Sequence, residues 1–150
     1  MHRRALLILA ASGAFTLAAS SPGTAQAQSA PAELRWTRIP AGDLERYEAT
    51  IGGLRVNNLT LGPEAGIEPA GPATAHEFTF TVANRGSAGQ RVMVQLVGQR
   101  ADGTPTLSTL VEVDVEPRRN ETGRERFYAS EEEVKQTAAY YLRVLALSHE

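Results

Sequence analysis

Strict alternation of apolar and polar residues is the feature that most constrains this chain. At positions 77–82 the sequence reads Glu-Phe-Thr-Phe-Thr-Val. Successive side chains of a β-strand point to opposite faces of a sheet, so this spacing predicts a strand with one buried face. We expect Phe78, Phe80 and Val82 to point into a hydrophobic core, and Thr79 and Thr81 to point away from it.

The same alternation recurs along the chain, and no long stretch repeats apolar residues at helical spacing. We expect further strands at 47–51, 54–61, 90–98, 107–115, 124–129 and 140–147. Strands at a spacing of roughly 10–15 residues, separated by turns, are typical of two antiparallel sheets that pack face to face. The sequence therefore predicts an all-β fold, an antiparallel β-sandwich of about seven strands.

Turn and capping residues mark the boundaries of these strands. Asp102-Gly103 suits the positive φ angles of a hairpin, and the apolar phase shifts by one at Asn57-Asn58, which predicts a β-bulge. Residues 62–74 hold three glycines and three prolines and are expected to form a loop. Ser130 and Glu133 have the Ser-x-x-Glu spacing of a capping box, which predicts a short helix before the last strand.

The first 27 residues have the three parts of a secretory signal peptide. His2-Arg3-Arg4 precedes an uncharged, largely apolar run from Ala5 to Ala19, and Ala25-Gln26-Ala27 supplies a small-x-small cleavage site. At about fifteen residues the run is too short to span a bilayer, which takes roughly 20. We predict cleavage after Ala27 and a periplasmic or secreted protein with no integral membrane segment. The alternative is a buried N-terminal helix.

Composition narrows the classes of partner. Loss of Arg3 and Arg4 with the leader leaves 13 basic against 17 acidic residues, a net charge of about −4, which argues against a nucleic-acid partner. Arginine outnumbers lysine 14 to 1, which indicates a bacterial, GC-rich coding bias. The chain has no cysteine, so the mature domain must be held together by packing without disulfides.

The inventory of reactive residues predicts no enzyme. There is no cysteine nucleophile, no Gly-x-Ser-x-Gly and no phosphate-binding loop. The mature chain has two histidines, His76 and His149, and His76 is expected to be a solvated residue where a strand begins. One histidine beside one carboxylate is short of a zinc site, and Glu131-Glu132-Glu133 suits a helix start better than a calcium loop. We predict no catalytic residues, no metal ligands and no cofactor.

Residues 28–47 lack the regular alternation that begins at Glu48. We treat them as a lead segment, irregular or with a short strand, that lies on a sandwich domain spanning residues 48–150. Trp36, the only tryptophan, lies in this segment between Arg35 and Arg38. Tryptophan and arginine are enriched at binding hot spots, so Trp36 is the candidate partner-binding residue. The alternative is that Trp36 caps the core of the sandwich.

The order of motifs resembles a known group of modules. Phe-Thr-Phe-Thr-Val-Ala-Asn-Arg-Gly begins at Phe78, and Val-Met-Val-Gln-Leu-Val-Gly-Gln-Arg-Ala-Asp-Gly begins at Val92. Val-Glu-Pro follows at Val115 and Tyr-Tyr-Leu-Arg-Val at Tyr140. Over residues 54–147 this is similar to bacterial immunoglobulin-like β-sandwich modules of the adhesion and FxLYD types. The chain departs from them in having Leu96-Val97-Gly98 in place of Leu-Tyr-Asp.

The resemblance implies an immunoglobulin-like sandwich with Tyr140 at a tyrosine corner, and a role in binding or assembly. We therefore expect an exported, non-enzymatic binding or accessory module that acts through protein–protein interaction with one or more envelope proteins. The alternatives are a small-ligand or carbohydrate-binding module that uses the loops at 62–74 or 84–89, and a hydrolase with its site between the sheets.

Overall fold

β-Strands make up most of the computed structural model, which describes residues 31–64 and 73–149. Its helices are a 3-10 helix, η1 (Ala41–Arg46), and a short α-helix, α1 (Glu131–Lys135). The strands are β1 (Ala32–Pro40), β2 (Ala49–Ile51), β3 (Leu54–Pro63), β4 (Thr74–Asn84), β5 (Gly89–Gln99), β6 (Pro105–Val115), β7 (Asn120–Ala129) and β8 (Ala139–His149). The predicted signal peptide, residues 1–27, lies outside the described residues, as do residues 65–72 of the predicted loop.

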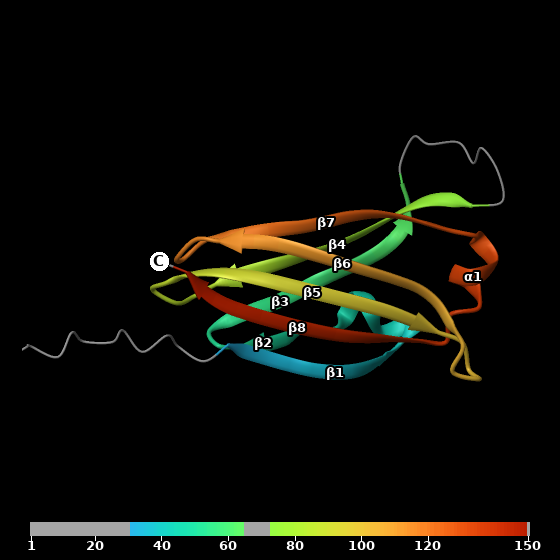
Figure 1. The fold of residues 1–150 in the computed structure, drawn as a ribbon, viewed down its shortest axis with the longest axis horizontal. Helices are drawn as coiled ribbons and strands as arrows, with labels where there is room; N and C mark the ends of the chain where they lie inside the picture. The colour runs from blue at the N-terminus through green and yellow to red at the C-terminus, as the bar shows by residue number, and fades with distance from the viewer. Residues whose placement is uncertain (1–30, 65–72, 150) are drawn as a thin grey trace, which may run out of the picture.

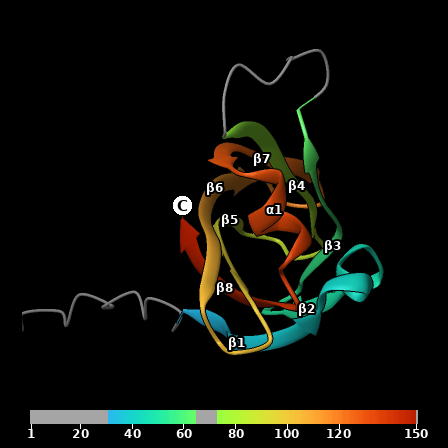
Figure 2. The same ribbon diagram turned by 90° about the vertical axis from the view of Figure 1, so that its right-hand side faces the viewer.

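The strands form two layers (Figures 1 and 2). Sheet A has the order β1-β8-β5-β6, and sheet B has the order β2-β3-β4-β7. Every paired strand runs antiparallel to its neighbour. The predicted all-β sandwich with a short helix before the last strand is therefore confirmed, with eight strands in the described part where about seven were expected.

The core lies between the two sheets and is built from the residues that alternation selects. Phe78, Phe80 and Val82 are fully buried on β4. Strand β5 contributes Val92, Val94 and Leu96, and β8 contributes Tyr140, Leu142, Val144 and Ala146. The inward faces thus follow the period of two predicted from the sequence.

Local signals position the turns as expected. The register of β3 against β4 shifts between Asn57 and Thr60, and Asn58 has a φ of 54°, which confirms the bulge. At the β5–β6 hairpin Gly103 has a φ of 87°, and the Asp102 carboxylate accepts a hydrogen bond from the Thr104 amide at 2.9 Å. Ser130 and Glu133 form both hydrogen bonds of the capping box at the start of α1.

Strand β1 is the largest difference from the sequence-based expectation. The segment predicted to be irregular or a short strand forms nine strand residues that pair with β8 at the edge of sheet A. Ile39 of β1 and Leu44 of η1 join the core cluster. A bulge opposite Arg143 places two residues, Arg35 and Trp36, where one would fit, and this extra residue breaks the alternation that would have revealed the strand.

Tyr140 lies in the core, with 5% of its surface exposed, but it does not complete the corner that the resemblance implies. A tyrosine corner requires a hydrogen bond from the phenol to nearby backbone. Among residues 31–64 and 73–149, the Tyr140 hydroxyl has no hydrogen-bond partner. Burial alone raises the pKa of this phenol.

Candidate binding surfaces

The outer faces of the two sheets differ in chemistry, and each carries one candidate surface. The outer face of sheet A is partly apolar. Trp36, Leu110 and Leu147 are exposed there, with 46%, 52% and 38% of their surface accessible. Met93, Val97, Tyr141 and Leu145 are half-buried on the same face. We call these seven residues the apolar face.

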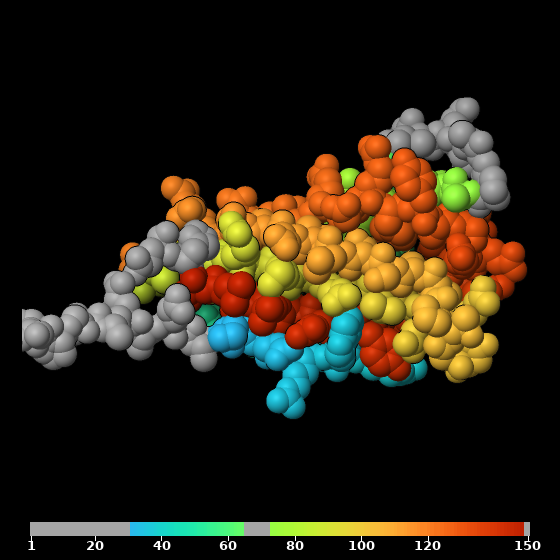
Figure 3. All heavy atoms as spheres, in the orientation of Figure 1, coloured from blue at the N-terminus to red at the C-terminus, as the bar shows by residue number. Residues whose placement is uncertain are grey.

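Strand register groups the apolar residues of sheet A, with Arg143 and Gln95 between Trp36 and Leu110. Val97 of β5 is paired with Tyr141 of β8, and Met93 is paired with Leu145. Gln95, between them on β5, is paired with Leu110 of β6. Figure 3 shows this side of the molecule, where β6, β5, β8 and β1 form one broad surface. Exposed apolar patches on soluble domains mark interaction sites.

Charged side chains lie within the apolar face as well as at its border, and Arg143 stands between Tyr141 and Leu145 on β8. Arg143 pairs with Glu33 at 2.9 Å, and Arg91 pairs with Asp114 at 2.9 Å. Arg35 and Arg38, on either side of Trp36, are exposed and form no ion pair within the described parts of the chain. The β1 border of this face therefore has two unpaired positive charges beside an exposed tryptophan.

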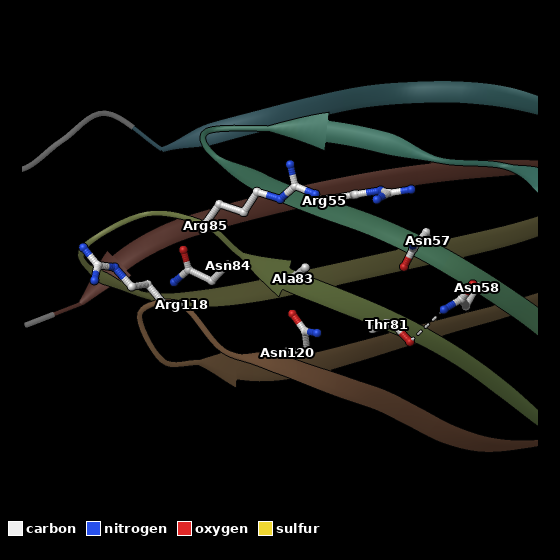
Figure 4. Close-up of a pocket in the computed structure, with 9 residues that line it drawn as sticks. All are labelled: Arg55, Asn57, Asn58, Thr81, Ala83, Asn84, Arg85, Arg118 and Asn120. Carbon is white, nitrogen blue, oxygen red and sulfur yellow. Dashed lines mark hydrogen bonds between the residues drawn. The ribbon is translucent and has the colours of Figure 1, made fainter.

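The outer face of sheet B is mostly polar, with Tyr128 as an exposed aromatic residue on β7, and ends in a shallow depression. Its rows of neighbouring residues read Arg55–Ala83–Asn120 and Asn57–Thr81–Thr122 across β3, β4 and β7. The depression has a volume of about 530 Å³. Three arginines line it, Arg55, Arg85 and Arg118, together with amide side chains and Thr81 (Figure 4). We call this site the polar depression.

Asn84 fixes the wall of the polar depression. Its buried amide donates to the carbonyls of Ala88 at 2.8 Å and Val115 at 3.1 Å, and its oxygen accepts from the Gly86 amide at 2.9 Å. These bonds tie the β4–β5 connection, including Arg85, to the end of β6. The sequence predicts that Asn84 lies in a turn. The strand pairing that brings Val115 of β6 next to Asn84 cannot be predicted from the residues around either position.

The structure separates the residues that sequence analysis singled out. Trp36 is exposed on the outside of β1, so the expectation that it caps the core is wrong. His76 is 3% exposed, not solvated as expected. Its ring stacks on Phe127 with centroids 5.7 Å apart, and its Nδ1 lies 2.9 Å from the Thr74 carbonyl oxygen. Strand β4 begins earlier than predicted and pairs His76 with Phe127 of β7, which moves the ring inside.

Helix α1 begins with Glu131, Glu132 and Glu133, and the three carboxylates do not gather at one site. Glu131 pairs with Lys135 one turn later, and Glu133 closes the capping box. Hydrogen bonds from Lys135 lower the pKa of Glu131, and the backbone amide of Ser130 lowers that of Glu133. Within the described residues no cluster of three or more His, Cys, Asp or Glu could hold a metal ion.

Neither surface was predictable as a unit from the sequence. The seven residues of the apolar face come from β1, β5, β6 and β8, and they alternate with core residues that dominate the apolar signal. The arginines of the polar depression lie at 55, 85 and 118 in the sequence, and they line one site because β3, β4 and β7 are neighbours. In the described part of the chain, no helix has the length and apolar character needed to cross a membrane.

Comparison with known proteins returns no matching family model, no matching curated protein and no matching solved structure.

Proposed function

We propose that this protein is an exported, non-enzymatic binding module that docks another envelope protein through the apolar face. The observation that carries the proposal is the exposure of Trp36, Leu110 and Leu147 on the outside of sheet A, whereas Tyr128 is the one large apolar side chain exposed on the described part of sheet B. Burial of aromatic and aliphatic side chains of this kind supplies most of the free energy of protein association.

The charges at the border indicate the chemistry of the partner. Arg35 and Arg38 would be left facing apolar surface if the partner had no acidic residues there, at a cost in desolvation. The partner is therefore a protein with an apolar patch flanked by carboxylates that meet the β1 border. The immunoglobulin-like resemblance favours the same class of role, because such modules mostly bind, space or assemble.

Photo-crosslinking in the native envelope tests this function. A photoreactive residue at position 110 should crosslink one envelope protein, whereas the same residue at Thr122 on the outer face of sheet B should not. The crosslink from position 110 should be lost in the Arg35→Glu/Arg38→Glu variant, which leaves the core untouched. Trp36 emission should lie at long wavelength in the isolated protein and shift to the blue in the purified complex.

Three results would contradict the proposal. Crosslinks of equal yield from positions 110 and 122 would show no preference for the apolar face. A crosslink from position 110 only to a second copy of this chain would make the face a self-association surface. A crosslink to a partner that survives reversal of the two arginine charges would refute the acidic border.

A further inference from the structure

The polar depression has a charge pattern that folding does not explain. Arg85 and Arg118 have no ion-pair partner within residues 31–64 and 73–149, and only Arg55 is paired, with Glu48 at 2.5 Å. The whole chain has a net charge of −2, so positive charges gathered at one end of one sheet are not a general property of its surface. Guanidinium groups bind carboxylates through paired, charge-assisted hydrogen bonds.

Arg118 occupies a backbone position that favours glycine. Residues 116–119 form a turn closed by the Arg119 amide and the Glu116 carbonyl at 3.2 Å, with Pro117 and Arg118 at its centre. Arg118 has a φ of 59°. Positive φ at the third residue of such a turn usually selects glycine, because a Cβ there clashes with the backbone. Residues held in this way cluster at functional sites, where their side chains are needed.

The neutral groups of the polar depression both donate and accept hydrogen bonds. Asn57, Asn58 and Asn120 contribute amides, and Thr81 contributes a hydroxyl that lies 3.5 Å from Nδ2 of Asn58. Nε of Arg55 and Oδ1 of Asn57 are shielded from solvent with no partner among the described residues. A buried group without a partner costs free energy, so both side chains gain by turning toward a ligand that supplies an acceptor and a donor.

These observations define the ligand by exclusion as well as by fit. A purely anionic ligand accepts hydrogen bonds but has nothing to donate to Oδ1 of Asn57. A neutral sugar leaves the guanidinium groups of Arg85 and Arg118 without a counter-charge, and among the described residues no aromatic ring lines the site for the sugar to stack on. Hydroxyl groups on a carboxylate-bearing frame satisfy both the amides and the arginines.

We propose that the polar depression binds an acidic saccharide of several units, whose carboxylates are held by Arg85 and Arg118 and whose hydroxyls bond to the asparagine amides. The site is open and extended along the strands, so a chain of sugar units can continue past it (Figure 4). It lies on the outer face of sheet B, opposite the apolar face on sheet A. A protein bound at one surface therefore leaves the other free, and this inference stands whether or not the proposed protein docking is correct.

Calorimetric titration of the mature protein at about 150 mM salt tests the proposal. The probes are trisaccharides of galacturonate, glucuronate, mannuronate and guluronate, with uncharged galactotriose and oligoglutamate as controls. At least one uronate should bind about tenfold or more tightly than both controls, because it alone combines carboxylates with hydroxyls.

Variants separate binding from folding. Arg118→Gly should raise stability slightly, because glycine relieves the positive φ, yet it should weaken uronate binding by about tenfold. Arg85→Ala should weaken binding to a similar degree. Arg35→Ala, on β1 of sheet A, is the matched control and should leave uronate affinity unchanged while it weakens protein docking.

The proposal is overturned if no uronate binds, or if galactotriose binds as tightly as the best of them. Oligoglutamate binding as tightly as any uronate would replace the saccharide with an acidic peptide. Unchanged affinity in Arg118→Gly, with folding intact, would remove the arginine from the site. None of these results depends on whether the apolar face docks a protein.

Discussion

Replacement of Gly123 by alanine tests the packing of the core most directly. Gly123 on β7 is paired with Phe80 on β4, and the Phe80 ring lies over the glycine. A Cβ at position 123 would lie 2.2 Å from Cζ, 2.6 Å from Cε1 and 2.7 Å from Cε2 of that ring. Carbon atoms in contact are about 3.5–4.0 Å apart, so three ring atoms would have to move by an ångström or so.

The ring has little room to move. Phe80 is fully buried, and its centroid lies 5.5 Å from that of Phe78. Overpacking a well-filled core costs about 1–3 kcal/mol, and we expect Gly123→Ala to fall near 2–3 kcal/mol because the displaced group cannot reach solvent. At roughly 3–5 °C per kcal/mol for a domain of this size, Tm should fall by roughly 6–15 °C.

Urea unfolding of a double-mutant cycle measures this effect. Phe80→Leu removes the clashing ring atoms, so Phe80→Leu/Gly123→Ala should be more stable than the sum of the two single losses by about 1 kcal/mol or more. Gly42→Ala is the control: it is exposed, no atom lies within 4 Å of its Cβ position, and its effect should stay within about 0.5 kcal/mol. A loss below about 0.5 kcal/mol in Gly123→Ala, or strict additivity with Phe80→Leu, would refute the reasoning.

Three further predictions concern polar groups. Ser130→Ala removes the N-cap oxygen that accepts from the Glu133 amide and should cost about 1 kcal/mol in urea unfolding; no measurable change would mean that α1 does not contribute to stability. Asn84→Asp and Asn84→Ala both lose the amide donors to the Ala88 and Val115 carbonyls, but aspartate also places a buried carboxylate against those two oxygens. Asn84→Asp should therefore lower Tm more than Asn84→Ala, and the reverse order would contradict the bonding pattern. Burial raises the pKa of Tyr140, so the folded state favours the neutral phenol. That contribution to the free energy of unfolding is complete below pH about 10 and is lost as the pH rises through the higher folded-state pKa. Tyr140→Phe should therefore lose less stability than the wild-type protein above pH about 10, in unfolding measured against pH. Equal losses in the two proteins would show that Tyr140 does not titrate with unfolding.

The two surfaces differ in how far the sequence alone predicts them. The apolar face can be partly anticipated, because Met93, Val97 and Leu145 stand at the outward positions of predicted strands where polar residues are usual. The polar depression cannot be anticipated, because Arg55 and Arg118 line one site only through the pairing of β3, β4 and β7. The positive φ of Arg118 is also invisible in the sequence, where Pro-Arg gives no turn signal as clear as Asp-Gly.

Where prediction failed, pairing over long range was the cause. His76 was expected in solvent, but β4 extends back to Thr74 and pairs with β7, so the ring is buried against Phe127. Trp36 was expected either at an interface or on the core. The bulge in β1 turns it outward and leaves Ile39 to fill the core.

The sequence by itself determined the two-layer β architecture, the inward sets on β4, β5 and β8, the Asn57 bulge and the capping box at Ser130. These are local properties: alternation, turn preference and capping act over at most a few neighbouring residues. Only the tertiary structure decided which outward side chains share a surface, that β1 completes sheet A, and that Arg55, Arg85 and Arg118 line one depression. Strand order and register set those neighbours, and both depend on packing between residues far apart in the chain.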